Sequence, residues 1–455
     1  MPEYTPKYQR CYSPRIQVLV KDPVTAEQMY DLSDDLTSIS TNKAYGRCSG
    51  TWQLMLPYRK WQRFGDEYVG YMDVLAPNQM LTIEMDAGDG AGMFPVMCGL
   101  IDRVSVVRQG GPVPQRMVKV SGRDFGKILE THDIAYDILT FNEQIATQSQ
   151  NGQSVPITNT LTRAFDPLVI TGTPKNLITK ILEDCLLNVL EVADRVNFFP
   201  FVDDTSKMYE PNMMNAQGVP LWQFIKRCEH HPFNVLTTDT NDKDVNAFDI
   251  ILEAQPIDDG TGNVKPQSGK WHTIGDAEIV SDDLGVSDQE RINLVCYQPL
   301  MYQQSITNFQ NISMVHPDFV EKDDASIKIN GLHAHVVRDQ FIPQDVKDPR
   351  NSDGTQGKAW SKVLTKRLWT WYKNNHTYES GSANIHLRPD IRVGSGLLIQ
   401  QPDKTYREYF IEQVSHQCVF HPQPQFITTL QLTRGQKASP KNAENAGPPQ
   451  GGKSA

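Results

Sequence analysis

Short runs in which apolar and polar residues alternate constrain this chain more than any other feature of its sequence. In residues 81–86 the odd positions hold Leu, Ile and Met, and the even positions hold Thr, Glu and Asp. Successive side chains of a strand point to opposite faces, so the odd positions are expected to face a core and the even positions solvent. Similar runs lie at 15–20, 117–121 and 93–108, the last long enough for a bent or bulged strand. Turn residues separate these runs, so residues 1–140 are predicted to form an antiparallel β domain.

The next segment, residues 141–232, has a different character. Residues 142–159 are rich in Gln, Asn, Ser and Thr, which is typical of a solvated loop. A helix is predicted to begin after Thr173, the candidate N-cap, with Pro174 at its first position, and apolar residues recur at helical spacing up to residue 189. A second short helix is predicted at 220–229. Residues 141–232 are therefore predicted to be a helical and loop insertion.

Strand patterns resume in residues 233–435, which are predicted to form a second β domain. The clearest runs are 233–237, 248–253, 293–297, 383–387, 406–416 and 425–434. One helix, 358–373, interrupts them, with an apolar stripe of Trp360, Val363, Leu364, Leu368, Trp371 and Tyr372. Lys358, Lys362 and Lys366 line another face, either as a surface for an acidic partner or as a solvated helix face. Residues 436–455 contain almost no apolar residues and are predicted to be a disordered tail.

Composition excludes several classes of protein. The 455 residues are too many for one ordinary core, and a net charge of −10 gives no global attraction to polyphosphate. The sequence contains neither a run of about 18 apolar residues that could span a membrane nor an apolar segment near its start, so folding in a cytoplasm is expected. The seven cysteines are scattered without a CxxC pair, and we interpret them as reduced and mostly buried.

No motif for catalysis, cofactor binding or metal binding stands out. The GxSxG, GxxxxGK[ST], HExxH and GxGxxG patterns are all missing from the sequence. Glu84, Asp86 and Asp89 are either an acid–base group or solvated edge carboxylates, and the second interpretation is preferred because they flank a glycine-rich turn. The histidines that could ligate a metal are His230, His231, His333, His335, His416 and His421, but their spacing favours surface or core histidines. No catalytic residue, cofactor or metal is therefore predicted.

Five segments carry a resemblance to a known family. Residues 120–129 read VSGRDFGKIL and contain Ser121, Gly122, Arg123 and Asp124. Residues 381–394 end in Gly394, and residues 409–416 are followed by 428–435, which end in Arg434 and Gly435. In this order, with residues 73–108 upstream, the segments resemble the baseplate hub proteins of contractile-tailed bacteriophages. That family is also related to the hub part of type VI secretion spike proteins.

The resemblance implies a fold, an assembly and a role. The fold would be mainly β with α insertions, namely two tube-like antiparallel β-barrel domains and a helical insertion. Three chains would form a homotrimer that adapts the hexameric tail tube to a trimeric spike, and genomic DNA would pass through it only in transit. Further partners would be baseplate wedge and tape measure proteins, with no membrane. The protein would be a non-enzymatic part of the virion tail baseplate, assembled in the host cytoplasm; the alternative from another class is a tail-associated cell-wall hydrolase.

The motif itself suggests roles for three residues. Gly122 is expected to adopt the positive φ of a sharp turn from strand to helix, and Asp124 to cap the first turn of that helix. Arg123 would form an ion pair either across a subunit boundary or within the turn. No short repeat follows Gly435, unlike in type VI spike proteins that carry their needle in the same polypeptide, so the spike is expected to be a separate chain.

Overall fold

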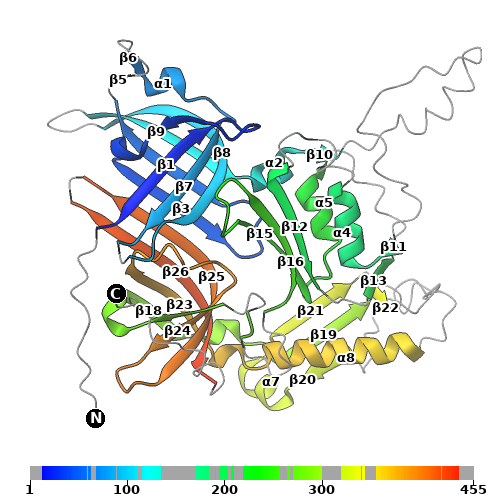
Figure 1. Ribbon diagram of the computed structural model, residues 1–455. Coiled ribbons are helices and arrows are strands. Elements are labelled where there is room, and N and C mark those ends of the chain that lie inside the picture. The colour runs from blue at the N-terminus through cyan, green and yellow to red at the C-terminus, as the bar shows by residue number, and fades with distance from the viewer. Residues whose placement is uncertain are drawn as a thin grey trace, which may run out of the picture.

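The computed structural model describes residues 13–134, 171–299 and 319–439, except for positions 59, 63–67, 89, 110–114, 184–185, 187–189, 191–193, 203–205, 210–218, 257–263, 267–269, 340, 344–354 and 422. Strands dominate, which confirms the predicted β class (Figure 1). Most strand pairs are antiparallel, but β12 with β16, β17 with β24 and β19 with β21 are parallel. The predicted loop at 142–159 lies outside the described residues.

The N-terminal part, up to residue 131, supplies nine strands and two short α-helices. These are β1 (Arg15–Lys21), β2 (Gln28–Asp31), β3 (Ser38–Ala44), β4 (Thr51–Pro57), β5 (Lys60–Gln62), β6 (Tyr68–Gly70), α1 (Tyr71–Val74), β7 (Met80–Asp86), β8 (Phe94–Gln109), β9 (Gln115–Asp124) and α2 (Gly126–Thr131). All four strands predicted from this region are confirmed, and β8 carries a bulge against β9 as expected for a strand of its length. The prediction missed β3, whose sequence is rich in Ser, Thr and Asn. It also missed β4, although Trp52, Leu54 and Leu56 occupy alternate, buried positions of that strand.

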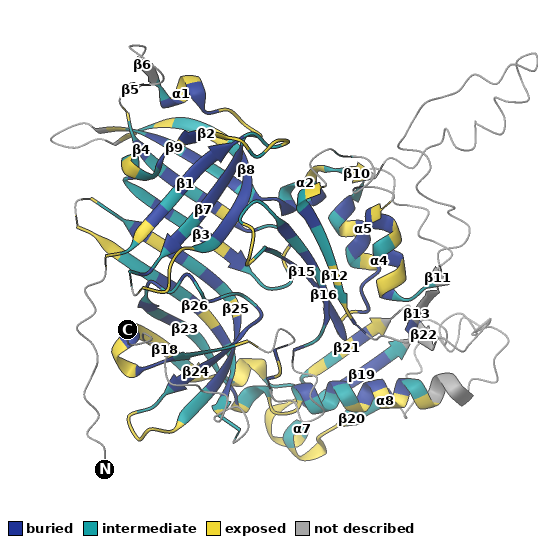
Figure 2. Ribbon diagram, in the orientation of Figure 1, coloured by how far each residue is buried: buried dark blue, intermediate teal, exposed yellow. Residues whose placement is uncertain are grey.

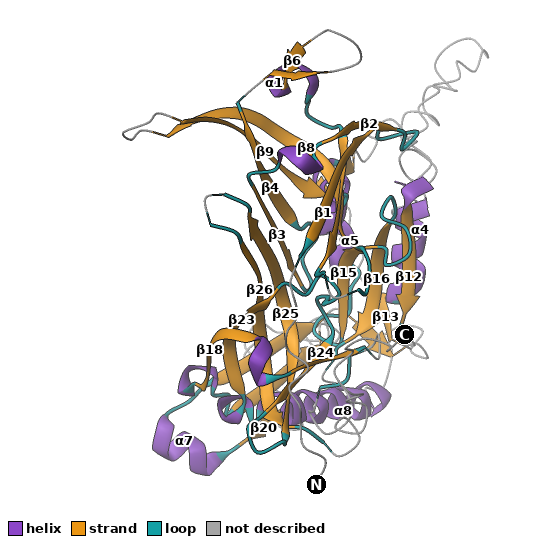
Figure 3. Ribbon diagram, turned by 60° about the vertical axis from the view of Figure 1, so that its left-hand side comes forward, coloured by secondary structure: helices purple, strands orange, loops and turns teal. Residues whose placement is uncertain are grey.

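The C-terminal part returns to the same sheet. It contains β17 (Trp271–Ile274), β18 (Ile279–Val286), β23 (Glu379–His386), β24 (Gly396–Gln400), β25 (Tyr406–Val419) and β26 (Gln425–Lys437). The sheet has 13 strands, and its main path runs β18-β23-β26-β25-β3-β4-β9-β8-β7-β1-β2. The joint is the antiparallel pair β25 and β3, in register from Gln413 opposite Ala44 to Val419 opposite Ser38. Strands more than 360 residues apart in the sequence are thus hydrogen-bonded neighbours, and Figure 3 shows them as one band.

Buried His416 lies in this joint, and we expect it to make the fold sensitive to acid. Burial lowers the pKa of His416 to about 3, and its Nδ1 lies 3.0 Å from Thr428 Oγ1. Because an unfolded histidine titrates near 6.5, the unfolded state binds the extra proton first, and stability should fall as pH drops from about 6.5 towards 3. We expect the free energy of unfolding to be about 2 kcal/mol lower at pH 5 than at pH 7 because of this residue. Urea unfolding at the two pH values measures the difference.

His416→Gln should reduce that pH dependence, whereas His421→Gln at an exposed position should retain it. Equal pH dependence in the two variants would contradict the assignment.

Apolar cores lie on both faces of the N-terminal strands. Leu81, Ile83 and Met85 pack in one cluster with side chains of β1, β4 and β9, as the alternation predicted. Thr82 was predicted to face solvent, and this was wrong: its side chain is 1% exposed. The middle of the chain covers that second face, where Met80 and Cys98 join a separate core (Figure 2). Alternation identifies one buried face but cannot show that another segment buries the other.

The middle part contains strands of three small sheets and two helices. Its elements are β10 (Asp133–Ile134), β11 (Thr171–Gly172), α4 (Pro174–Leu182), β12 (Val196–Phe201), β13 (Ser206–Tyr209), β14 (Val219–Pro220), α5 (Leu221–Arg227), β15 (Asn234–Thr240) and β16 (Phe248–Ala254). The sheets are β12-β16-β15, β10-β14 and β11-β13, the last extended by β22 (Phe341–Pro343). Thr173 caps α4, since its side chain accepts from Asn176 N at 3.4 Å, as predicted. Both predicted helices are present, and β12, which pairs with β16, was missed. Apolar residues of α4, α5, β15 and β16 share one core.

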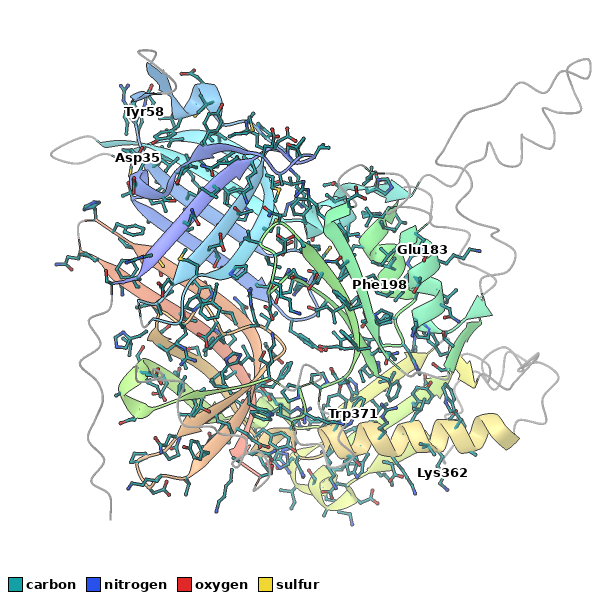
Figure 4. All side chains as sticks on the ribbon, viewed as in Figure 1. Asp35, Tyr58, Glu183, Phe198, Lys362 and Trp371 are labelled. Carbon is teal, nitrogen blue, oxygen red and sulfur yellow. The ribbon has the colours of Figure 1, made fainter. Side chains whose placement is uncertain are left out.

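A separate three-stranded sheet packs against the long helix α8 (Thr355–Tyr372), which confirms the helix predicted there. The sheet contains β19 (Leu294–Pro299), β20 (Val320–Lys322) and β21 (Ala334–Asp339), with α7 (Asp324–Asn330) and β22 (Phe341–Pro343) nearby. Trp371 is fully buried on the inner side of α8, and Lys362 lies on its outer side (Figure 4). Val363 was predicted to be in the buried stripe, and this was wrong: it is 62% exposed, on the face it shares with Lys362 and Lys366.

Two further sequence expectations can be compared with the fold. Among the described residues, no helix is both long and apolar enough to cross a bilayer. Five cysteines are described, and all are buried and free, as predicted. Burial raises the pKa of the Cys418 thiol to about 12, which makes it unreactive at neutral pH. Cys11 and Cys185 lie outside the described residues.

Candidate functional site

The residues singled out from the sequence lie in separate places, and the most connected is Asp124. This residue ends β9 and is fully buried. Its carboxylate accepts hydrogen bonds from Gly50 N at 2.7 Å and Gly126 N at 2.9 Å, and it forms an ion pair with Lys43. Burial raises the pKa of Asp124, and Lys43 with the two backbone donors opposes that rise. Asp124 thus accepts from an N–H of the first turn of α2, as expected, although the N-cap position is Phe125, whose side chain makes no capping bond.

Lys43 links the surroundings of Asp124, called here the Asp124 corner, to β15 in the middle part of the chain. Its ammonium also donates to Thr238 Oγ1 at 2.8 Å, and Thr238 donates in turn to backbone carbonyls near the start of β4. One buried ion pair therefore holds together β3, β9 and β15, which belong to distant parts of the sequence. Lys43 was not identified from the sequence, because a single lysine in a polar strand carries no signal of burial.

Gly122 has a different role from the one predicted. It lies within β9, opposite Trp52 of β4 and Ile101 of β8, and the positive-φ glycines of the described chain do not include it. A β-carbon at this position would overlap the Leu100 carbonyl oxygen and the Trp52 ring. Glycine is needed here for the close approach of a neighbouring ring and backbone, not for a turn. Ser121 precedes it as an ordinary strand residue opposite Gln53.

Arg123 pairs within its own chain. Its guanidinium donates to both carboxylate oxygens of Asp102, at 2.9 and 3.2 Å, and to Glu130 Oε2 at 2.7 Å. Lys127 also pairs with Asp102 at 2.9 Å. Of the two interpretations of Arg123, the structure has the local salt bridge, which orients α2 against β8.

The C-terminal motif residues form two other contacts. Gly394 has a φ of +74° and lies against the ring of Tyr45, a conformation and a closeness that both favour glycine. Arg434, with a φ of 58°, donates to the Trp371 carbonyl oxygen at 2.6 Å and places its guanidinium 5.1 Å from the Tyr378 ring centre. Gly435 follows it and lies against the Tyr409 ring. Arg434 thus fastens the end of α8 to β26.

The candidate acids are not arranged as the solvated edge carboxylates that the sequence suggested. Glu84 and Asp86 lie on β7, which is paired on both sides, and both are half-buried. Asp86 Oδ1 accepts from Gly88 N at 2.8 Å, which is a turn contact. Asp89 lies outside the described residues.

Of the candidate histidines, His230 and His416 are buried and His335 packs on an aromatic ring, whereas His231 and His421 are exposed. His230 is buried, with its ring stacked 4.4 Å from that of Phe341 and its Nδ1 2.8 Å from Ser206 Oγ. His335 packs on Tyr372, at 4.6 Å between ring centres. Within the parts of the chain that the structure describes, no three His, Cys, Asp or Glu side chains gather closely enough to hold a metal.

A cavity of about 320 Å³ lies between the sheet β12-β16-β15 and the residues that directly precede β17 and β24. Its lining includes four carboxylates and three cationic side chains: Asp239, Asp242, Asp249, Glu253, Lys243, Lys270 and Arg392. Arg392 lies 3.3 Å from Asp242 and 3.8 Å from Asp239, so the cavity also contains the ion pairs that join the two parts. Sequence reasoning missed this cavity, because its residues come from four separated segments.

No protein-family model matches this sequence, and no curated protein matches it either. Solved structures do resemble the fold. The 43 kDa tail protein of prophage MuSo2 from Shewanella oneidensis is 11% identical, with 93% of this chain and 98% of that one covered and a TM-score of 0.51. A tail protein from Neisseria meningitidis MC58 is 10% identical, with 93% and 97% covered and a TM-score of 0.49. A component of the Escherichia coli type VI secretion system is 8% identical, with 90% and 74% covered and a TM-score of 0.41.

The first of these similarities confirms, at the level of the fold, the resemblance drawn from the sequence. It extends over nearly the whole of both chains, including the middle region for which the sequence offered no motif. The chain therefore has the fold of a phage tail protein.

Proposed function

We propose that this chain is the baseplate hub of a contractile phage tail, a homotrimer that adapts the hexameric tail tube to the trimeric spike. The observation that carries the proposal is the shared fold with the prophage tail protein along 93% of this chain. Its domains would be the two β regions at 1–140 and 233–435, the insertion at 141–232 and the tail at 436–455, and each β region would be one tube-like barrel.

The sheet topology supports this proposal. In one chain, a set of N-terminal strands and a set of C-terminal strands join in a single sheet through the β3–β25 pair. Three chains would therefore offer six sets of strands to a six-fold tube. The main path of the sheet ends at β2 in the N-terminal part and at β18 in the C-terminal part. Head-to-tail contact, repeated three times, would bring these unlike ends together and close a ring.

The partners follow from that position. The hub would contact the tail tube protein, the spike protein and the wedge and tape measure proteins of the baseplate, and it would belong to the virion after assembly in the host cytoplasm. Genomic DNA would pass through the ring, and a duplex carries one negative charge per roughly 1.7 Å. A wall rich in Lys and Arg would hold it, so we expect an electronegative lumen, in keeping with the net charge of −10.

The proposed role is structural, not enzymatic. The half-buried Glu84 and Asp86 and the packed His230 serve the fold in the described structure. The shared tail-protein fold supports the structural role over the cell-wall hydrolase alternative.

The trimer can be tested by mass. Light scattering of the purified chain, with the spike protein added, is expected to give three copies of the 51.4 kDa chain. Val286→Arg, at a 64% exposed position on β18, should weaken the trimer if this edge closes the ring. Val363→Arg, 62% exposed on α8, is the matched control and should leave the mass unchanged. A stable monomer in the presence of spike, or a ring lumen dominated by Lys and Arg, would contradict the hub.

A further inference from the structure

The three-stranded sheet β12-β16-β15 has one face that its helices do not cover. Phe198 packs with the core shared by α4 and α5, on the opposite face. The strand registers place the residues of the face without helices in three rows. From one end these rows are Asn197, Asp249 and Asp239; then Phe199, Ile251 and Thr237; then Phe201, Glu253 and Val235. The cavity described above lies on this face, since Phe199, Asp249, Ile251 and Glu253 line it.

Cationic partners are unevenly distributed among the carboxylates of the cavity. Lys270 pairs with Asp242, and Arg392 serves Asp242 and Asp239. Asp249 instead accepts neutral amide donors, from Asn197 at 3.0 Å and Asn241 at 3.0 Å. Lys270 and Arg392 are therefore paired with Asp242 and Asp239, and among the described residues Asp249 has only neutral donors.

Glu253 lies away from these cations. It is 7% exposed, and its Oε1 accepts from Tyr45 Oη at 2.7 Å. Among the described residues no donor reaches Oε2, so a nearly buried carboxylate presents one oxygen without a partner to the cavity. Burial raises the pKa of Glu253 to about 7, because no cation offsets the loss of hydration.

Two exposed phenylalanines lie beside this carboxylate. Phe199 is 36% exposed and Phe201 63% exposed, and their rings stack with centres 5.9 Å apart. Phe201 is opposite Glu253 in the register of β12 and β16. Aromatic faces next to a carboxylate bind a guanidinium well, because the cation stacks on the rings while its N–H groups donate to the oxygen.

We propose that this cavity binds the guanidinium of an arginine side chain that a partner protein inserts, with Glu253 Oε2 as acceptor and Phe199 along the side-chain stem. The occupant is assigned to a protein segment, not to a free small cation, because the aromatic surface continues beyond the cavity. Phe201 stacks on Phe199 but does not line the cavity and is 63% exposed. The residues that flank an inserted arginine would cover Phe201, whereas a small cation inside the cavity would leave it exposed. The inference does not depend on the trimeric ring.

Calorimetric titration of the purified full chain with short probes at pH 8 tests the proposal. N-acetyl-arginine amide should bind, and its neutral isostere N-acetyl-citrulline amide should bind at least about tenfold more weakly. Glu253→Gln should weaken binding of the arginine probe about tenfold. Tyr45→Phe, which removes the neighbouring hydroxyl but keeps the carboxylate, should still bind the arginine probe.

The source of the guanidinium is tested with a longer probe. Acetyl-Ala-Ala-Arg-Ala-Ala-amide should bind more tightly than free agmatine, and Phe201→Ala should remove that difference. Because Phe201 is exposed, this variant tests the site even if Glu253→Gln fails to fold. Equal binding of the citrulline and arginine probes, or unchanged binding by Glu253→Gln, would overturn the site. Agmatine binding as tightly as the peptide would overturn the assignment to a partner protein.

Discussion

Replacing Trp371 with alanine is expected to lower the free energy of unfolding by about 3 to 5 kcal/mol. The ring is fully buried where α8 crosses β19, and its centre lies 5.5 Å from that of Phe233. The Arg367 guanidinium lies 5.4 Å from the same ring. Removing the indole would leave a cavity among rings that belong to different elements and cannot all move inward together.

Urea unfolding of the full chain measures this loss. Val363→Ala is the matched control, since Val363 lies on the same helix but is 62% exposed, and we expect a change within about 0.5 kcal/mol. A loss of less than about 1 kcal/mol for Trp371→Ala would mean that α8 contributes little to the stability of the folded chain.

The second large effect is expected at the buried ion pair. Asp124→Ala should destabilise the protein by about 3 to 5 kcal/mol, because the Lys43 ammonium would remain buried without a counter-charge. The side chains of Lys43 and Asp124 are only 10% and 1% exposed. Gly50 N and Gly126 N would also lose their acceptor.

Two controls separate the charge from the hydrogen bonds. The double variant Lys43→Met with Asp124→Asn carries no buried charge and keeps one acceptor, so it should recover a large part of the lost stability. Asp102→Ala removes a carboxylate that is 29% exposed and should cost less than about 1 kcal/mol. If Asp124→Ala and Asp102→Ala lower the free energy of unfolding equally, the Asp124 corner does not hold β3, β9 and β15 together.

Much of the secondary structure could be predicted because its cause is local. The alternation in 81–86 and the helical stripe ending at Trp371 are properties of neighbouring residues, and both elements form where expected. Strands β3 and β12 were missed because their polar or aromatic residues acquire a buried face only from strands and helices elsewhere in the chain. Strand β4 was missed although its alternation of buried Trp52, Leu54 and Leu56 is a local pattern. Val363 was misplaced because a periodic stripe does not specify its own width.

The candidate sites divide in the same way. The segment around Asp124 could be singled out from the sequence, and its junction between β9 and α2 is present. The reason for Gly122 could not be predicted, because the Trp52 ring that requires a glycine comes from another strand. Arg123 pairs with Asp102 and Glu130, and these partners could be identified only once β8 and α2 had been placed.

The sequence by itself determined the β class, the helix at α8, the burial of the five described cysteines and the resemblance to a tail-protein family, since each depends on residue type and short spacing. Only the tertiary structure decided that the two β regions share one sheet through β3 and β25, and that Lys43 and Asp124 meet. It also brought Glu253, Phe199 and Arg392 around one cavity. Contacts between residues hundreds of positions apart depend on how whole elements pack, and no local pattern encodes which of them become neighbours.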